Sequence, residues 1–152
     1  MHVRPATRQD AAAWSALRAA LWPEGDAIEL RAEVEAFFLG EVPPTLIAAV
    51  FLAESDSGTL VGMLELSLRP YADGCESSPV PFVEGWYVAP RCRRQGVGSA
   101  LVNAAEHWAM GQGYTEMASD ALLENTISEH AHKALGFAEV ERVIRFRKEL
   151  KR

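Results

Sequence analysis

The amino-acid sequence predicts a single α/β (α+β) domain built on a mixed β-sheet. The chain has 152 residues, of which 49% are apolar and 24% charged, a composition that suits one compact core. Apolar side chains recur at helical intervals in four segments, and the other apolar runs are typical of strands. The resulting order is strand, two helices, three strands, helix, strand, helix, strand, which indicates a mixed sheet with flanking helices.

Residues typical of helix starts, helix ends and turns predict the positions of the helices and strands in the first half of the chain. Thr7 and Asp10 have the spacing of a capping box, and Pro23 ends the helix that follows over residues 8–21. Asp26 repeats the start signal for a second helix, which Gly40 ends. Two apolar runs with β-branched members, residues 45–53 and 59–68, flank a polar turn and therefore predict a hairpin.

The second half begins with a long loop. Residues 69–81 contain three prolines and a glycine, and loops of this length in a compact domain are usually functional. The next strand, 82–88, contains Gly85, which indicates a β-bulge or the close approach of a ligand. The remaining expected elements are a helix from Val97 to Ala109, a strand over 114–119, a helix over 125–135 and one or two strands within 137–150.

Composition and charge exclude several classes of function. Fifteen basic and 21 acidic residues give a net charge of −6, which repels a phosphate backbone, so no nucleic-acid partner is expected. The N-terminus has no apolar signal segment and no window reaches ~18 apolar residues, so neither secretion nor a membrane partner is expected. Cys75 and Cys92 have no disulfide or metal spacing, which favours a reduced, cytoplasmic setting without a metal.

The charges are unevenly distributed along the chain. Residues 54–84 contain six acids and one base, Arg69, and residues 95–132 contain five acids and no lysine or arginine. Between these acidic stretches, three arginines occur within residues 91–94. This pattern predicts a local anion site in an otherwise acidic protein.

The segment from Phe82 to Leu101 is expected to form that anion site. A strand leads into a glycine-containing turn that opens a helix, so the unpaired amides of residues 94–99 converge at the positive end of the helix dipole. A P-loop is a poor fit because Ser99 follows Gly98 without a lysine, and a dinucleotide fingerprint lacks its third glycine at Leu101. A glycine-rich helix start that only turns the chain remains the structural alternative.

The pattern Arg93-x-x-Gly96-x-Gly98 resembles the acetyl-coenzyme A signature of the GCN5-related N-acetyltransferases, the GNAT family. Asn125, which opens a helix ending in Leu135-Gly136-Phe137, is similar to a second element of that family. The resemblance covers nearly the whole chain and implies one N-acetyltransferase domain over residues 1–152. It also implies a mostly antiparallel sheet of six to seven strands, splayed between the fourth and fifth strands, with about four helices.

The resemblance implies acetyl-CoA as cosubstrate, no metal, and direct transfer of the acetyl group to an amine in a ternary complex. The pantetheine arm is expected to pair with the backbone of residues 86–88, and a backbone amide near Val88 to polarise the thioester carbonyl. The residues expected to bind acetyl-CoA are Trp86, Tyr87, Val88, Arg93, Arg94, Gln95, Gly96, Val97, Gly98, Ser99 and Asn125.

A narrower resemblance concerns the amine acceptor. Several segments look like those of aminoglycoside 6′-N-acetyltransferases: Leu21-Trp22-Pro23, the loop from Tyr71 to Val80, Phe82-Val83-Glu84-Gly85, the stretch 118–128 and Glu141-Arg142-Val143-Ile144. An aminoglycoside is a small sugar with several ammonium groups, and clustered carboxylates attract such a polycation. The residues that this resemblance implies for the acceptor are Trp22, Asp26, Tyr71, Glu76, Glu84, Asp120 and Glu141.

Three side chains are candidates for catalysis. Glu84 and Asp120 can accept the proton that the attacking ammonium must lose, although Glu84 can equally be a binding carboxylate and Asp120 an acid that faces water. His132 stands where many family members carry a tyrosine that protonates the leaving thiolate. Imidazole can do the same work, or the histidine can be a surface or packing residue.

Three functions remain open from the sequence. The first is an aminoglycoside 6′-N-acetyltransferase, an antibiotic-resistance enzyme. The second is a GNAT acetyltransferase for a polyamine, an amino acid or a protein amine, and the third is a non-catalytic acyl-CoA-binding sensor. A homodimer is expected from the resemblance alone.

Overall fold

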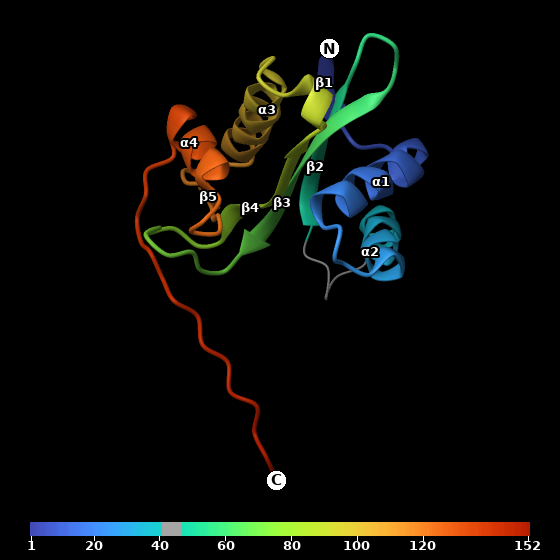
Figure 1. Ribbon diagram of the computed structural model, residues 1–152. Helices are drawn as coiled ribbons and strands as arrows, with labels where there is room; N and C mark the ends of the chain where they lie inside the picture. The colour runs from blue at the N-terminus through green and yellow to red at the C-terminus, as the bar shows by residue number, and fades with distance from the viewer. Residues whose placement is uncertain (41–46) are drawn as a thin grey trace. The chain divides into compact units, whose positions relative to one another are not determined.

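Five strands form one sheet, with α1 and α2 against one face and α3 against the other (Figure 1). The computed structural model describes residues 1–40 and 47–152. The elements are β1 (His2–Pro5), the 3-10 helix η1 (Arg8–Asp10), α1 (Ala11–Leu21), α2 (Ala27–Leu39), β2 (Ile47–Glu54), β3 (Leu60–Arg69), β4 (Val80–Val88), the 3-10 helix η2 (Pro90–Cys92), α3 (Val97–Gly111), β5 (Ala118–Ser119) and α4 (Thr126–Ala134).

The strand order is β1-β2-β3-β4-β5, and each strand is antiparallel to its neighbour except for the parallel pair β4 and β5. The expected mixed sheet, hairpin and four helices are therefore confirmed. Residues 45 and 46, which were expected to begin the first hairpin strand, lie outside the described residues. No helix in the described part of the chain is both long and apolar enough to cross a membrane.

The prediction of six to seven strands is wrong. The chain forms two compact units, Met1–Asp120 and Ala121–Arg152, and the five-stranded sheet belongs to the first. In the second unit, α4 is followed by an extended segment, and the described residues 137–152 include no strand. A strand needs a neighbour to pair its backbone amides and carbonyls, and this segment forms no such ladder with the parts of the chain that the structure describes. The strand expected over 114–119 is also shorter, covering Ala118–Ser119.

The main core lies between α1, α2 and the sheet. Trp14 of α1 is fully buried, and its ring meets Phe37 and Phe38 of α2 edge-on at centroid distances of 5.4 and 5.8 Å. The buried side chains packed in this cluster are Trp14, Leu17, Val34, Val50, Leu52 and Met63. This packing fixes the position of α1, including its C-terminal end at Leu21, relative to the sheet.

The expected capping box at the start of the first helix is present. The Asp10 carboxylate accepts hydrogen bonds from the Thr7 amide at 2.7 Å and the Thr7 hydroxyl at 2.9 Å. Arg4 donates to both carboxylate oxygens at 2.8 and 2.9 Å and also binds Glu54 at 2.8 Å. Hydrogen bonds from Arg4 outweigh the effect of burial and lower the pKa of Asp10 well below its usual range.

Replacing Asp10 by asparagine is expected to lower the free energy of unfolding by about 1–2 kcal/mol at neutral pH, because a cap and a nearly buried ion pair are lost. A carboxylate whose pKa is lowered by folding stabilises the fold above its ordinary pKa of about 4, and this contribution shrinks as the pH falls further. Urea denaturation of both proteins at pH 7 and pH 3 measures the difference. A difference of equal size at the two pH values would contradict the assignment.

Candidate functional site

The turn between β4 and α3 has the backbone expected of an anion site. After η2, Arg94 adopts a left-handed conformation (φ 60°), and Gly96 does so again (φ 83°) as the N-cap of α3. A Cβ at Gly96 would meet no atom within 4 Å, so the space beside this residue is open. The amides that begin α3 have no partner within the helix and carry the positive end of its dipole. The turn therefore offers amides to an anion at a place where no side chain intervenes.

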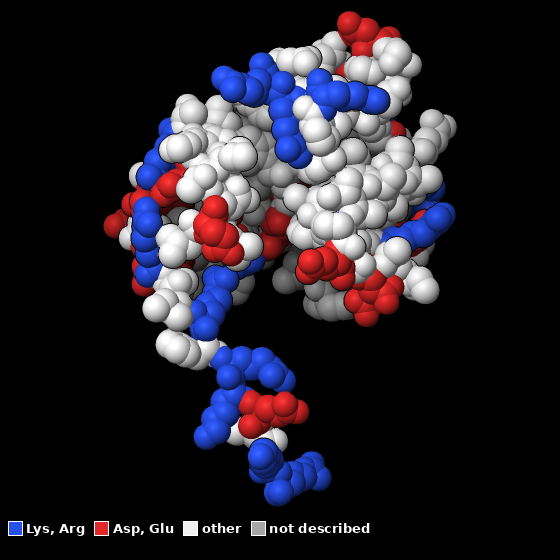
Figure 2. Space-filling model, in the orientation of Figure 1, with Lys and Arg blue, Asp and Glu red and all other residues white. Residues whose placement is uncertain are grey.

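Arginines flank this turn. The Arg93 side chain donates to the Val88 carbonyl at 2.8 Å and lies over the Tyr87 ring, which ties the turn to the end of β4. Gln95 closes the turn by donating to the Arg91 carbonyl at 3.1 Å. Figure 2 shows Lys and Arg side chains gathered where Figure 1 places η2 and the start of α3. Positive charge and free amides thus coincide, as an anion site requires.

Glycine is needed at position 98 for a different structural reason than at position 96. A Cβ at Gly98 would lie 3.2 Å from the Trp86 ring, so this glycine allows α3 to pack closely on β4. Tyr87, the next residue of β4, packs against the core cluster on the α1 side of the sheet. The side chains of Trp86 and Tyr87 therefore point to opposite faces. Either residue can reach an acyl-CoA arm lying in the plane of the sheet through its backbone.

The predicted splay between β4 and β5 is confirmed. The two strands pair only at Phe82 with Ala118 and at Val83 with Ser119 among the described residues. Beyond Val83, β4 continues to Val88 with β3 on one side only. Among the described residues, no second strand pairs with residues 85–88, which is the arrangement that an extended ligand uses in β-augmentation.

The bulge expected near Gly85 lies at Glu84. Glu65 of β3 pairs with Gly85 and Leu66 pairs with Val83, so Glu84 is the additional residue in β4. A bulge re-aims a side chain, and the Glu84 carboxylate accepts from the Ser67 hydroxyl at 2.6 Å. The sheet itself therefore fixes the position of one of the predicted site carboxylates.

Glu84 is paired with a cation. Arg69 donates to its two oxygens at 2.8 and 2.9 Å, and the Arg69 guanidinium lies 3.5 Å from the centre of the Phe82 ring. Partial burial would raise the pKa of Glu84, but the hydrogen bonds from Arg69 and Ser67 outweigh it and lower that pKa. The hydrogen bond to Glu84 and the charge of Asp120 both raise the pKa of Arg69. Arg69 thus pairs with Glu84 and is also influenced by the charge of Asp120, the other predicted carboxylate.

The loop between β3 and β4 is held by a residue that sequence reasoning missed. One oxygen of Glu116 accepts from the Glu76 amide at 2.9 Å, the Ser77 amide at 2.7 Å and the Ser77 hydroxyl at 2.6 Å. These hydrogen bonds, led by that of the Ser77 hydroxyl, lower the pKa of Glu116. The loop carries Tyr71, whose hydroxyl donates to Asp73 at 2.8 Å and whose ring is largely exposed. Glu116 thus fixes the loop that contains two predicted acceptor residues, Tyr71 and Glu76.

Replacing Glu116 by alanine is expected to release this loop while leaving the sheet folded. The amides of Glu76 and Ser77 lose their acceptor, so their hydrogen exchange should accelerate on the order of tenfold. Hydrogen exchange followed by NMR measures this, with Glu35→Ala on the exposed side of α2 as a control that also removes one carboxylate. Unchanged protection of both amides would show that Glu116 does not anchor the loop.

Trp22 and Asp26 lie on either side of the turn between α1 and α2. Trp22 is the C-cap of α1, and its ring lies so close to Gly85 that a Cβ there would be 2.9 Å from it. Trp22 therefore borders the bulge that carries Glu84. Asp26 is the N-cap of α2 and accepts from the amides of Ile28 at 2.8 Å and Glu29 at 3.2 Å. Its carboxylate consequently has a structural role.

Three predicted site residues belong to the C-terminal unit. Asn125 caps α4 by accepting from the Ser128 amide at 3.1 Å. Nδ1 of His132 lies 2.7 Å from the Ser128 carbonyl oxygen, which can only accept, so Nδ1 carries the proton. The His132 ring also meets Phe137 edge-on at 5.2 Å. Glu141 lies in the extended segment after α4 and is exposed.

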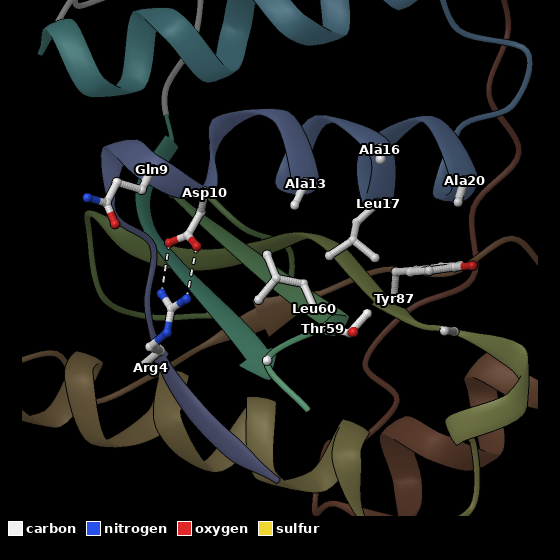
Figure 3. Close-up of a pocket in the computed structure, with 12 residues that line it drawn as sticks. Arg4, Gln9, Asp10, Ala13, Ala16, Leu17, Ala20, Thr59, Leu60 and Tyr87 are labelled. Carbon is white, nitrogen blue, oxygen red and sulfur yellow. Dashed lines mark hydrogen bonds and ion pairs between the residues drawn. The ribbon is translucent and has the colours of Figure 1, made fainter. Parts of the chain in front are cut away.

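A surface pocket of about 480 Å³ lies beside α1, on the face of the sheet that carries Tyr87 (Figure 3). The ion pair of Arg4 and Asp10 closes one end of the row of side chains drawn there, and the Tyr87 ring lies at the other end. Leu17 and Leu60 lie between them. No predicted acceptor residue lines this pocket, so it is separate from the predicted acceptor site.

The sequence contained signals for some of the residues that were missed. Glu65 interrupts an apolar strand, and Arg18 shares the apolar face of α1 with Trp14, which is unusual for charged residues and indicates that they are paired. Arg69 was the one base in an acidic stretch. Glu116 carried no comparable signal, because its partners are loop amides 39 and 40 residues away.

The chain matches known acetyltransferases along most of its length. A family profile described as "Acetyltransferase (GNAT) family" matches residues 12–137. The chain is 51% identical over 148 residues to an "Aminoglycoside N(6')-acetyltransferase type 1" of Klebsiella aerogenes, which covers 97% of this chain and 96% of the relative. It is 45% identical over 139 residues to a protein of that name from Serratia marcescens, covering 91% and 92%.

Two solved structures have the same fold. The structure of AAC(6')-Iy in complex with the bisubstrate analogue CoA-S-monomethyl-acetylneamine superimposes with a TM-score of 0.88 at 39% identity, covering 98% of each chain. The structure of aminoglycoside 6'-N-acetyltransferase AAC(6')-IG from Acinetobacter haemolyticus has a TM-score of 0.86 at 40% identity, covering 99% of this chain and 100% of the other. With its splayed sheet, open turn and matching family profile, this chain belongs to the GNAT family of acetyltransferases.

Proposed function

We propose that this protein is an aminoglycoside 6′-N-acetyltransferase that uses acetyl-CoA as cosubstrate, with residues 1–152 acting as one domain. The observation that carries the proposal is 51% identity, over nearly the whole of both chains, to a relative that bears this name. The acidic character of the chain, with a net charge of −6, suits a polycationic acceptor.

The turn before α3 fits the diphosphate of acetyl-CoA. The open space at Gly96, the amides of residues 97–99 and the side chains of Arg93 and Arg94 provide hydrogen-bond donors and positive charge without a covering side chain. The part of β4 after Val83, where β5 no longer pairs with it, is suited to hold the pantetheine arm. Acetyl-CoA supplies an acetyl group activated as a thioester.

The acceptor site uses carboxylates and aromatic rings. Glu84, fixed at the bulge, and Asp120, at the end of β5, are proposed to bind ammonium groups and to move the proton that the amine must lose. The remaining proposed acceptor residues are Trp22, Asp26, Tyr71, Glu76 and Glu141. His132 is proposed to donate a proton to the leaving thiolate, and Asn125 to help hold acetyl-CoA.

Thiol release from acetyl-CoA tests the proposal directly. Kanamycin and tobramycin are expected to accelerate release strongly, whereas spermidine and a lysine peptide are not. The site of transfer is checked by NMR of the acetylated product, which should carry the acetyl group on the 6′-nitrogen. Preferential turnover of spermidine or the peptide would assign a different acceptor, and acetyl-CoA binding without turnover of any amine would indicate a sensor.

The same proposal includes a homodimer in the cytoplasm. The C-terminal segment exposes Ile144 and Phe146 at 81% and 91%, and exposed apolar side chains in an extended segment suit packing against a second copy. Cys75 and Cys92 are free thiols, which suits a reducing compartment. Analytical ultracentrifugation is expected to give twice the chain mass, and a single-chain mass at micromolar concentration would exclude the dimer.

A further inference from the structure

A buried ion pair lies beneath the proposed acceptor site. Glu65 of β3 is 1% exposed and Arg18 of α1 is 3% exposed, and Arg18 Nε lies 3.2 Å from Glu65 Oε1. The same Glu65 oxygen accepts from the Trp14 indole N–H at 2.8 Å. Burial raises the pKa of Glu65, against the opposing effects of Arg18 and Trp14. Charged side chains are seldom buried so completely, and their cost has to be offset by hydrogen bonds and pairing.

Arg18 connects three elements at this point. Its guanidinium donates to the Leu30 carbonyl of α2 at 3.2 Å, forms an ion pair with Glu33 of the same helix, and faces Glu65 of the sheet. One planar side chain thus joins α1, α2 and β3 in a fixed arrangement. Lysine cannot reproduce this fork of donors.

The Arg18 guanidinium also lies over the Trp22 ring. Its central carbon lies 5.1 Å from the centre of the Trp22 ring, a distance at which cation–π attraction operates. The Trp22 ring in turn lies against Gly85, where an added Cβ would approach it to 2.9 Å. Gly85 pairs with Glu65 and follows Glu84 in the bulge. The ion pair, the indole ring and the bulge therefore form one continuous set of contacts.

We propose that Arg18 is a positioning residue that holds the Trp22 ring against the bulge, so that the ring borders the acceptor site beside Glu84. Glu65 is the counterion that makes a buried Arg18 tolerable, and it has no direct part in binding. This inference rests on the proposed function, because it makes Trp22 part of the acceptor site. It adds a role for two residues that belong to neither the proposed acetyl-CoA site nor the proposed acceptor site.

Paired substitutions distinguish an effect of Arg18 on the position of Trp22 from an effect on the stability of the protein. Arg18→Met alone leaves the Glu65 carboxylate buried without its cation and is expected to lower the melting temperature. Arg18→Met combined with Glu65→Gln removes both charges, so the melting temperature should recover relative to the single variant. In this double variant, KM for the aminoglycoside is expected to remain raised on the order of tenfold, with KM for acetyl-CoA unchanged. Glu65→Gln alone keeps Arg18 and should keep the wild-type KM for the acceptor.

A spectroscopic measurement tests the position of Trp22 without any assay of activity. In protein labelled with 5-fluorotryptophan, the ¹⁹F resonance of Trp22 is identified by its loss in Trp22→Phe. That resonance should shift or broaden in the Arg18→Met/Glu65→Gln variant, while the resonance of Trp108 on α3 should not move. An unchanged Trp22 resonance, or a wild-type acceptor KM in the double variant, overturns the inference.

A double-mutant cycle supplies the last check. If Arg18 acts through Trp22, adding Arg18→Met/Glu65→Gln to Trp22→Phe should raise the acceptor KM no further. Full additivity of the two changes would overturn the inference. Failure of the wild-type enzyme to acetylate any aminoglycoside would instead overturn the proposed function, and the fluorine resonance would still report whether Arg18 holds Trp22.

Discussion

Replacing Gly96 by valine is expected to weaken acetyl-CoA binding about tenfold to a hundredfold. Gly96 has a φ of 83°, and a β-branched residue is strongly disfavoured in this left-handed region. Such backbone strain costs of order 1–3 kcal/mol, and the turn can relieve it only by moving the amides that begin α3. The added side chain would also enter the open space beside the turn. Isothermal titration calorimetry with acetyl-CoA measures the effect.

Gly113→Val provides a matched control for this substitution. Gly113 also has a left-handed φ, 91°, and a Cβ there would likewise meet no atom within 4 Å. It follows the C-terminal end of α3, so the variant imposes the same kind of strain at the other end of the helix. Both variants are expected to lose similar stability, but only Gly96→Val should lose affinity for acetyl-CoA. Equal affinities in the two variants would remove the turn from the proposed coenzyme site.

The features that the sequence predicted well are those that depend on neighbours along the chain. The glycine turn before α3, the capping box at Thr7 and Asp10, and the bulge near Gly85 follow from the conformations that individual residues prefer. The splay of the sheet followed from the family resemblance and from the glycine that interrupts β4. The conformational preferences of single residues were sufficient to predict these features, because the alternative backbone conformations are sterically costly.

The features that were missed depend on pairing between distant segments. Arg69 and Glu84 are 15 residues apart, and their pairing follows from the register of β3 against β4, which the one-residue bulge shifts. The Arg18–Glu65 pair joins α1 to β3 through the buried core. The strands expected in residues 137–150 were wrong for a related reason, since an apolar alternating pattern forms a strand only where a partner edge exists.

The pairing of Glu84 with Arg69 also suggests different roles for Glu84 and Asp120, the two carboxylates proposed for proton transfer. Glu84 accepts three hydrogen bonds, two from Arg69 and one from Ser67, and its pKa is lowered. A carboxylate with a lowered pKa is a weaker base, because it gains less on accepting a proton. The lowered pKa supports the proposal of Glu84 as an ammonium ligand, and the role of proton acceptor is proposed for Asp120.

Asp120→Asn is accordingly expected to lower kcat about a hundredfold, the lower range for loss of a general base. Glu84→Gln is expected to raise KM for the aminoglycoside on the order of tenfold and to change kcat little, because it removes the charge of a binding group. Steady-state kinetics from pH 5 to pH 9 measure both. The pH dependence of kcat should be unchanged in Glu84→Gln, because the pKa of wild-type Glu84 is lowered further from this range.

Asp56→Asn, in the turn between β2 and β3, removes one carboxylate from an exposed position and should leave kcat and KM at their wild-type values. If Glu84→Gln lost kcat while Asp120→Asn did not, the assignment would be reversed, and Glu84 at the bulge would be the base that accepts the proton. Arg69 would then have to release Glu84 when the acceptor binds, because a carboxylate held by two charge-assisted hydrogen bonds is stabilised in its ionised form. Comparable kcat loss in both variants would indicate that the two carboxylates act together in proton transfer.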